Sequence, residues 1–255
     1  MRYTLAVLSI IIAILLLTSL RGGAQNLPNL PPADAATKGP IVAELFTSQS
    51  CSSCPPAEKL FAELSEREDL IVLEWHVDYW DRLVHGRAGS WKDPYSSPDH
   101  TDRQRLYNRT LRSSGRVYTP QAVINGVSET VGSYRDEVER QLVAPPHATA
   151  NVSVISQASQ LHVTIEAFTS PLARDADIYR LTLLPSQTTA VPRGENRGSV
   201  LKSKNIVLAA EKVGAYSGAA QSLKIAAPKP GETCAILIQE KRGARLGPVL
   251  GASYC

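Results

Sequence analysis

The feature that most constrains this chain is a pair of cysteines two residues apart, placed between an apolar run and a helix-like segment. Ile41–Phe46 has the composition of a buried strand, and Leu70–Val77 predicts a second one. Between them lie Cys51 and Cys54, followed by two prolines that fit a first helical turn. Apolar residues then recur at helical spacing. The order strand, CxxC, helix, strand predicts a βαβ unit with a parallel sheet.

The first 24 residues have the pattern of a secretory signal peptide. Arg2 precedes the apolar run Leu5–Leu20, and Gly22 and Ala24 are small residues spaced like a cleavage site. An uncleaved anchor is the alternative, although the run is shorter than the ~20 residues that a spanning helix needs. Residues 25–38, rich in proline and alanine, predict a spacer. We therefore expect a periplasmic or secreted protein without a stable membrane span after cleavage.

The charge balance bears on partners. Two of the 27 basic side chains, Arg2 and Arg21, lie in the leader, which leaves 25 basic side chains against 24 acidic ones. A near-neutral chain shows no electrostatic signature of nucleic-acid binding, so we expect no nucleic acid partner. We also expect no cofactor.

A long loop, a helix and a hairpin follow the βαβ unit. Asp78–Pro98 predicts a polar and aromatic loop of a length that is usually functional. Thr101 and Gln104 form a capping-box pattern for a helix that runs to about Leu111. Asn125-Gly126 is a strong hairpin signal. The flanking strands are predicted at Gln121–Ile124 and Val127–Val131, and a last helix is predicted after a cap at Ser133.

The patterning changes at Ala144-Pro145-Pro146. Beyond this point apolar and polar residues alternate, as in Leu161–Glu166 and Tyr179–Leu183, which is typical of antiparallel strands with one buried face. Pro192–Lys204 predicts a long loop. The predicted fold is an α/β thioredoxin-like domain at 39–144 followed by a small all-β sandwich-like domain at 147–255. Further strands are predicted at Ser222–Ala226, Thr233–Gln239 and Pro248–Ser253.

A CxxC on the strand-to-helix turn of a βαβ unit is typical of thioredoxin-like redox domains. A helix start offers unpaired N–H groups and partial positive charge, which stabilise a thiolate. We expect Cys51 to be the exposed nucleophile and Cys54, more buried, to resolve the mixed disulfide that Cys51 forms. A permanently closed structural disulfide is the alternative.

Three other positions complete the predicted site around the cysteines. In thioredoxin-like folds a cis-proline precedes a strand and faces the CxxC, and Thr119-Pro120 is at the matching point; an ordinary trans turn proline is the alternative. His76 ends the second strand, where ligands gather in open α/β sheets. It could act as a base for Cys54, or join both cysteines in holding a soft metal such as Cu(I). A hydrogen-bonded core histidine is the alternative.

Aromatic residues of the long loop form the expected substrate surface. Trp80 and Trp91, together with Thr119, are predicted to contact a partner peptide. The alternative is that these rings simply pack under the loop.

Cys234 and Cys255 predict a second disulfide of a different kind. Two predicted strands flank a turn around Gly243-Ala244, which brings Cys255 nearly opposite Cys234. Cross-strand neighbours are close enough for a disulfide, and export favours pairing. We predict a structural bond here; two unrelated buried thiols are the alternative.

Long and specific strings spread over most of the chain after the spacer resemble those of a known family. They are Glu44–Gln49, Cys51–Ala57, His76–Asp81, Trp91–Pro94, Arg103-Gln104, Tyr107, Val117–Gln121, Arg193–Asn196 and Asn205. The chain is identified by them as similar to the domain-of-unknown-function 1223 family (DUF1223), a thioredoxin-like group of secreted, mostly bacterial proteins. The resemblance implies a thioredoxin-like fold, and it implies no particular substrate.

The chain departs from these patterns at two points. Val84–Ser90 interrupts a family string that otherwise runs on to Trp91, so the loop near the site is longer. A typical thioredoxin has an aspartate six residues before the first cysteine, where this chain has Leu45. Glu44 is one residue off, which on a strand means the opposite face. The partner for proton transfer at Cys54 is therefore not evident.

Three functions remain open from the sequence. The first is a thiol–disulfide oxidoreductase that acts through Cys51 and Cys54 on exported protein thiols or a redox partner. The second is a Cu(I)-binding protein that uses both cysteines and His76. The third is a non-catalytic binding module that its disulfides brace.

Overall fold

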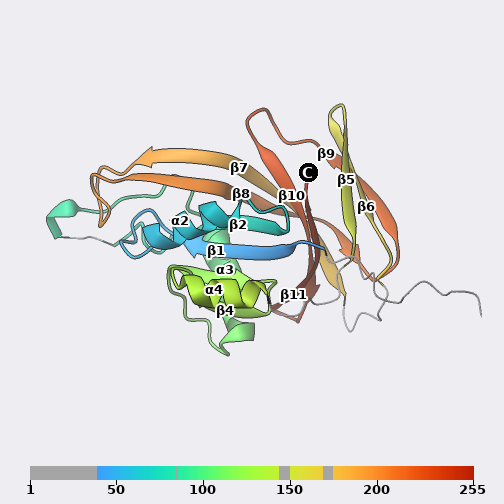
Figure 1. The fold of residues 1–255 in the computed structure, drawn as a ribbon, viewed down its shortest axis with the longest axis horizontal. Coiled ribbons are helices and arrows are strands. Elements are labelled where there is room, and N and C mark those ends of the chain that lie inside the picture. The colour runs from blue at the N-terminus through green and yellow to red at the C-terminus, as the bar shows by residue number, and fades with distance from the viewer. Residues whose placement is uncertain (1–38, 84–85, 144–149, 169–174) are drawn as a thin grey trace, which may run out of the picture. The chain divides into compact units, whose positions relative to one another are not determined.

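The described part of the chain is built mainly of strands (Figure 1). The structure is a computed structural model that describes residues 39–83, 86–143, 150–168 and 175–255. The predicted signal peptide, the spacer and the boundary at 144–147 lie outside these residues. No helix within the described ranges is long and apolar enough to cross a membrane.

The strands are β1 (Ile41–Thr47), β2 (Leu70–His76), β3 (Gln121–Ile124), β4 (Ser128–Val131), β5 (Val152–Gln157), β6 (Gln160–Ile165), β7 (Ala176–Ala190), β8 (Val200–Tyr216), β9 (Gln221–Ala226), β10 (Thr233–Lys241) and β11 (Leu246–Tyr254). The helices are α2 (Pro55–Leu64), α3 (Pro98–Leu111), α4 (Arg135–Leu142) and a short 3-10 turn at Gly86–Ala88.

The predicted strand–helix–strand unit is present. β1 and β2 run parallel, in register from Ile41↔Leu70 to Thr47↔His76. β3 pairs antiparallel with the other edge of β1, and β4 with β3. The turn between β3 and β4 places Asn125 and Gly126 at positive φ, 48° and 67°, as the hairpin signal predicts.

One mixed sheet joins strands from both halves of the chain, in the order β11-β10-β7-β8-β2-β1-β3-β4. The two halves meet where β8 pairs parallel with β2, at Glu74↔Ile206. The fold is therefore a mostly-β structure with a large mixed sheet. We predicted an α/β domain followed by a separate sandwich-like domain, and this differs from the structure because one sheet runs through both halves of the chain. Thr37–Cys255 forms one compact unit, while the exact division predicted at 144–147 stays a prediction.

A second sheet of three strands, in the order β5-β6-β9, lies against part of the first. Val163 and Ile165 of β6 share one apolar cluster with Ile178 of β7 and with Ile236 and Ile238 of β10. This two-layer arrangement agrees with the sandwich-like character predicted for the second half. It differs in that one of the two layers is an extension of the sheet that carries the cysteine motif.

β1 is buried on both faces because other elements pack on each side of it, and its side chains alternate between the two sides. Ala43 and Leu45 pack with the apolar faces of α2 and α4. Val42 and Phe46 point the other way, into a cluster with Trp75 of β2 and residues of α3, β10 and β11. The sheet therefore carries helices α2 and α4 on one side and α3 on the other.

Glu44 lies on the α3 side of β1, opposite Leu45, as the alternation predicts. Its carboxylate accepts two hydrogen bonds from Arg103 of α3, at 2.7 and 2.9 Å. Arg103 Nη2 also donates to Gln239 Oε1 of β10 at 2.8 Å, and the Tyr107 hydroxyl donates to Glu44. This buried network ties the first strand to a strand from the other half of the chain.

Three local predictions were wrong. The third helix begins at Pro98 and not at Thr101, because Ser97 caps it by accepting a hydrogen bond from the Asp99 amide at 3.2 Å. Val200–Lys204, predicted as loop, begins β8, where exposed Val200 and Lys202 alternate with buried Leu201 and Ser203. The fourth helix begins at Arg135, one residue after Tyr134 rather than directly after Ser133.

Cys234 and Cys255 form the predicted disulfide, with 5.2 Å between their Cα atoms. The Cys255 amide also donates to the Cys234 carbonyl at 3.0 Å. The bond therefore fastens the end of β11 to the start of β10.

Replacing Arg103 tests the buried network. Arg103→Met leaves the Glu44 carboxylate buried without its cation, which costs about 3–5 kcal/mol in proteins. We expect a loss of this size in the free energy of unfolding, measured by denaturant titration. Arg105→Met is the matched control, because Arg105 makes an exposed pair with Asp102 on the same helix; it should cost less than about 1 kcal/mol. Equal effects of the two variants would contradict this account.

Candidate functional site

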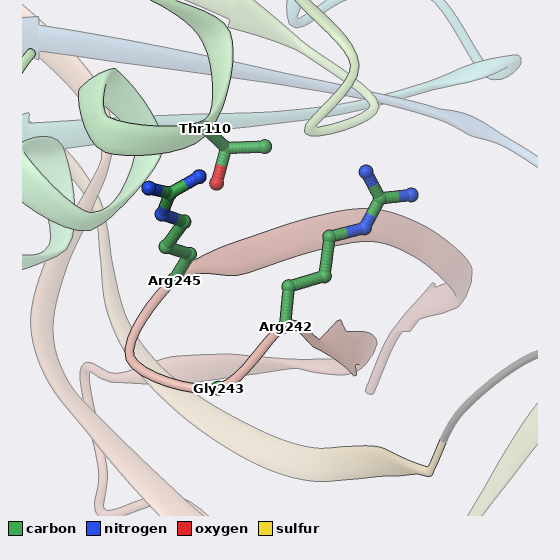
Figure 2. Close-up of a pocket in the computed structure, with 4 residues that line it drawn as sticks. All are labelled: Thr110, Arg242, Gly243 and Arg245. Atoms are coloured by element: carbon green, nitrogen blue, oxygen red, sulfur yellow. The ribbon is translucent and has the colours of Figure 1, made fainter. Parts of the chain in front are cut away.

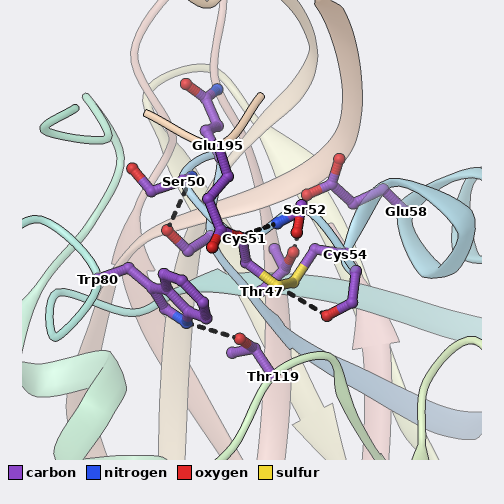
Figure 3. The surroundings of a disulfide bond; sticks show 12 residues. Thr47, Ser50, Cys51, Ser52, Cys54, Glu58, Trp80, Thr119 and Glu195 are labelled. Atoms are coloured by element: carbon purple, nitrogen blue, oxygen red, sulfur yellow. Dashed lines mark hydrogen bonds between the residues drawn. A yellow bond between two sulfur atoms is a disulfide. The ribbon is translucent and has the colours of Figure 1, made fainter. Parts of the chain in front are cut away.

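The Cys51–Cys54 disulfide lies where β1 ends and α2 begins (Figure 3). Cys54 is the N-cap residue of α2, and Pro55 opens its first turn. The Cys51 amide donates to the Ser48 carbonyl at 3.0 Å, and the Cys54 amide donates to the Cys51 carbonyl at 3.1 Å. The Cys54 N–H is therefore bonded within the turn, and Cys51 Sγ lies 3.3 Å from Ser53 Oγ.

Both cysteines are fully buried, with 0% of each residue exposed. The prediction that Cys51 is exposed was wrong. Sequence spacing places a residue on a turn, but it does not show which distant segments cover that turn. Ser52 and Ser53, between the cysteines, are exposed, so the turn itself reaches the surface although its two sulfurs do not.

Two segments lie against the cysteine turn and are hereafter called the cover. The first is the loop after β2, which contributes Trp80 and Trp91. Trp80 Nε1 donates to Thr119 Oγ1 at 2.7 Å, and both side chains lie beside the disulfide (Figure 3). Trp91 Nε1 donates to Gln49 Oε1 at 3.1 Å, and its carbonyl accepts from Ser50 Oγ at 2.8 Å. The predicted substrate-contacting residues therefore surround the cysteine turn, and their role in binding stays a prediction.

The loop between β7 and β8 forms the other part of the cover. Asn196 Nδ2 donates to the carbonyls of Gln49 and Cys51, at 2.9 Å each. Glu195 Oε2 accepts from the Ser52 amide at 2.9 Å. Gly194 has φ +78°, and a Cβ there would lie 3.2 Å from the Cβ of Trp91. A side chain at this position would press against the tryptophan, so the turn favours glycine.

The peptide bond between Thr119 and Pro120 is cis, as predicted. Phe46 pairs with Gln121 in the antiparallel register, which places Pro120 beside Thr47 at the end of β1. The proline therefore lies at the same end of the sheet as the cysteine turn.

His76 is buried between two carboxylates. Its Nδ1 lies 2.7 Å from Asp93 Oδ2, and its Nε2 lies 3.7 Å from Glu74 Oε2. Burial alone would lower the pKa of His76, but the two carboxylates raise it well above the ordinary value. The pKa of Asp93, which burial tends to raise, is lowered by His76 and by hydrogen bonds from the amides of Gln49 and Tyr95. His76 and Asp93 therefore form an ion pair at neutral pH.

Glu58 and Glu74 are two further carboxyl groups in the same region. Glu58, in the first turn of α2, is 2% exposed and accepts a hydrogen bond from Thr47 Oγ1 at 2.7 Å. Burial, with repulsion from Glu74, raises the pKa of Glu58 to about 7. Burial also raises the pKa of Glu74. Glu58, Glu74, His76 and Asp93 are hereafter called the acid cluster. Within it, the Glu58 carboxyl holds a proton that dissociates near neutral pH.

The acid cluster offers no evident metal site. Among the described residues, no group of three or more His, Cys, Asp or Glu side chains is arranged to hold a metal ion. The cysteine sulfurs are bonded to each other, and both ring nitrogens of His76 face carboxylates.

A separate hollow lies at the turn between β10 and β11, next to the end of α3 (Figure 2). It measures about 510 Å³ and is lined by Thr110, Arg242, Gly243 and Arg245. Arg242 donates to Glu240 at 2.9 Å, and Thr110 donates to the Leu246 carbonyl at 2.7 Å. These groups bond to the protein itself, and the hollow carries none of the chemistry around the cysteines.

Fold and site together define a mostly-β protein in which a buried CxxC disulfide lies near a group of buried carboxyl side chains. The chain belongs to the family described as "Protein of unknown function (DUF1223)", which matches residues 42–239. No curated protein matches it.

Two solved structures resemble the chain. Protein AGR_C_4864 from Agrobacterium tumefaciens, solved by X-ray crystallography, has 28% identity and a TM-score of 0.71, over 84% of this chain and 92% of that chain. HBP35 of Porphyromonas gingivalis has 13% identity and a TM-score of 0.59, over 86% of this chain and 75% of that chain. The second likeness concerns the fold alone.

The sequence reasoning missed Glu58, Glu74 and Asp93. Glu58 had a usable signal, because it follows Cys54 by four residues and so shares its helix face. Glu74 shares a strand face with His76 by alternation. Asp93 gave no such signal, since a loop residue carries no periodicity.

Removing the Asn196 side chain should make the disulfide easier to reduce. Asn196→Ala deletes two hydrogen bonds to the cysteine turn, each worth about 1 kcal/mol, so opening should become about thirtyfold more frequent. We expect dithiothreitol to reduce Cys51–Cys54 about thirtyfold faster, measured by thiol labelling and mass spectrometry. Arg197→Ala, at the exposed neighbouring position, is the control and should react at the rate of the unmodified protein. An unchanged rate in Asn196→Ala would show that this loop does not limit access.

Glu58 should make stability fall as pH rises. A carboxyl whose pKa is higher in the folded than in the unfolded chain binds more protons when folded, so stability is lost between the two values. For Glu58 this window runs from 4.5 to about 7 and corresponds to at most about 3 kcal/mol. Urea titrations across this window should show the fall, and Glu58→Gln should flatten it. A fall of the same size in Glu58→Gln would assign it to other groups.

Proposed function

We propose that this protein is an exported thiol–disulfide exchange protein that acts through Cys51 and Cys54 on protein thiols. The observation that carries the proposal is a CxxC disulfide at the start of a helix, at the end of a parallel strand pair and close to a cis-proline. A helix start stabilises the thiolate that forms when such a disulfide opens. The export of the chain belongs to the proposal as well.

The surrounding topology supports a thioredoxin-like half. β1, α2 and β2 form the parallel unit, and β3, β4 and α4 complete a layer beside it. Strand order β2-β1-β3-β4 with α2 and α4 on one face places the cysteine turn and Pro120 at one end of the sheet. A CxxC at the start of a helix, at the same end of the sheet as a cis-proline, is what we expect of a thioredoxin-like redox site.

Exchange at Cys51 requires the cover to open. A partner sulfur must reach Cys51 along the axis of the disulfide, and the residue is 0% exposed. The contacts that hold the cover include the Trp80–Thr119 and Trp91–Gln49 bonds and the bonds of Glu195 and Asn196 to the cysteine turn. They come from side chains of two loops rather than from strand or helix pairing, which suits a segment that opens more readily than the sheet.

A second candidate function follows from the same burial. If the cover stays closed, Cys51–Cys54 is a brace, and the protein is a binding module with two structural disulfides. The complete burial of both sulfurs favours this reading. A brace and an exchange site differ in their reduction potential, because structural disulfides resist reduction by the glutathione pool.

The exchange function predicts trapped intermediates. Cys54→Ala removes the resolving thiol, so Cys51 should remain joined to protein partners as mixed disulfides, separated on non-reducing gels. Cys51→Ala is the matched control and should trap far less, because its remaining thiol is the resolving one. The redox titration of the intact protein should place the Cys51–Cys54 potential well above that of Cys234–Cys255. Potentials of both bonds below about −300 mV, with no trapped partner, would favour the brace.

A further inference from the structure

We propose that Glu58 is the group that exchanges a proton with the sulfur of Cys54 when the Cys51–Cys54 disulfide opens and closes. This inference rests on the proposed thiol exchange and assigns its proton-transfer residue. The position that carries a carboxyl in thioredoxins is Leu45 here, packed in the apolar cluster below α2. Glu44 is committed to Arg103 on the opposite face of β1. Glu58 reaches the cysteines from the helix.

Helix geometry brings Glu58 next to Cys54. Cys54 already has helical backbone angles, φ −81° and ψ −36°, and the Glu58 amide donates to its carbonyl at 3.1 Å. Side chains four residues apart lie on the same face of a helix, one turn from each other. Figure 3 shows the Glu58 side chain among the residues around the disulfide, directed toward Thr47. Thr47 is the last residue of β1, so its bond to Glu58 Oε1 holds that oxygen at the end of the sheet where the cysteine turn begins.

The groups that face Glu58 set when it holds its proton. Glu74 and His76 approach from β2, and Asp93 approaches from the loop after β2. The His76–Asp93 pair is internally neutral, so Glu74 remains as a neighbouring acid, and burial with repulsion from Glu74 brings the pKa of Glu58 to about 7. At this value the carboxyl can both give and accept a proton near neutral pH.

Glu58 also has an outlet to solvent. A hollow of about 310 Å³ between α2 and the start of β8 is lined by Glu58 together with Lys59, Val200 and Lys202, among others. Val200 is exposed, so the hollow is open to water on this side. Glu58 thus lies between the buried disulfide and the surface, where a proton taken from the cysteine can be passed on.

The proposed step is balanced in atoms and electrons. On opening, an external thiolate attacks Cys51 Sγ, the S–S bond breaks, and Cys54 Sγ leaves with the bonding electron pair. The Glu58 carboxylic acid gives its proton to this sulfur and becomes a carboxylate. On closing, the Glu58 carboxylate takes the proton from the Cys54 thiol, the resulting thiolate attacks Cys51 Sγ, and the external thiolate is released. The external thiol or disulfide is the co-reactant.

The pH dependence of disulfide reduction tests the assignment. Dithiothreitol should be used at concentrations where the rate is proportional to it, from pH 5 to pH 9. In the unmodified protein, the rate should rise with the thiolate fraction and then flatten above about pH 7, as Glu58 loses its proton. Glu58→Gln, which keeps the shape and an oxygen for Thr47, should be about tenfold slower below pH 7 and rise without the break.

Matched variants separate proton transfer from a structural role. Glu63→Gln changes an exposed carboxyl on the same helix and should keep the profile of the unmodified protein. Glu58→Asp retains a titratable group, so its rate should be lower while the break remains. If Glu58→Gln folds poorly, the infrared carbonyl band of the protonated acid in the unmodified protein decides: it should disappear near pH 7 on titration.

Failure of this assignment and failure of thiol exchange as the function give different results. A Glu58→Gln profile identical to that of the unmodified protein, or an acid band that does not titrate near pH 7, would overturn the role of Glu58. Absence of trapped partners in Cys54→Ala would overturn the proposed function. Because dithiothreitol reports on the chemistry of the disulfide itself, the first result does not depend on the second.

Discussion

Strand β1 is the constraint on which the rest of the structure depends, because it is paired on both edges and buried on both faces. One face carries Leu45 against the helices, and the other carries Glu44, whose charge requires Arg103. Arg103 in turn binds Gln239 from the far half of the chain. A single alternating strand therefore fixes the position of α2, the position of α3 and the connection between the two halves. The cysteine turn is attached to the end of this most restrained element.

The region around the cysteines combines a rigid base with a cover held by side-chain bonds from two loops. Below the turn, the strand ends and the ion pair of His76 with Asp93 leave little freedom, since both groups are buried and bonded. Above it, the cover depends on side-chain bonds from Trp80, Glu195 and Asn196. In the exchange that we propose, this division would keep the two cysteines in place while the covering loops control access. It also explains how a fully buried disulfide can be compatible with exchange.

The sequence predicted those parts of the fold that depend on local periodicity. β1, β2 and the β3–β4 hairpin were predicted within a residue or two, because alternation and the Asn125-Gly126 turn are local signals. The pairing of Cys234 with Cys255 followed from strand symmetry about a turn. The pairing of β8 with β2 was not predictable, since it joins residues about 130 positions apart through the single bridge Glu74↔Ile206. The prediction that Cys51 is exposed was wrong for the same reason, because Asn196, which contacts the Cys51 carbonyl, is 145 residues away in the sequence.

The acid cluster has a consequence for the electrostatics of the whole molecule. A count from the sequence gives a formal net charge of +3, with every carboxyl ionised and every histidine neutral. Inside the fold, His76 carries a proton, and burial keeps a proton on Glu74 over a wider pH range than in an unfolded chain. At neutral pH the four groups of the acid cluster therefore carry less negative charge in the native protein than they carry in the unfolded chain. The base of the cysteine turn is thus closer to neutral than its three carboxyl groups suggest.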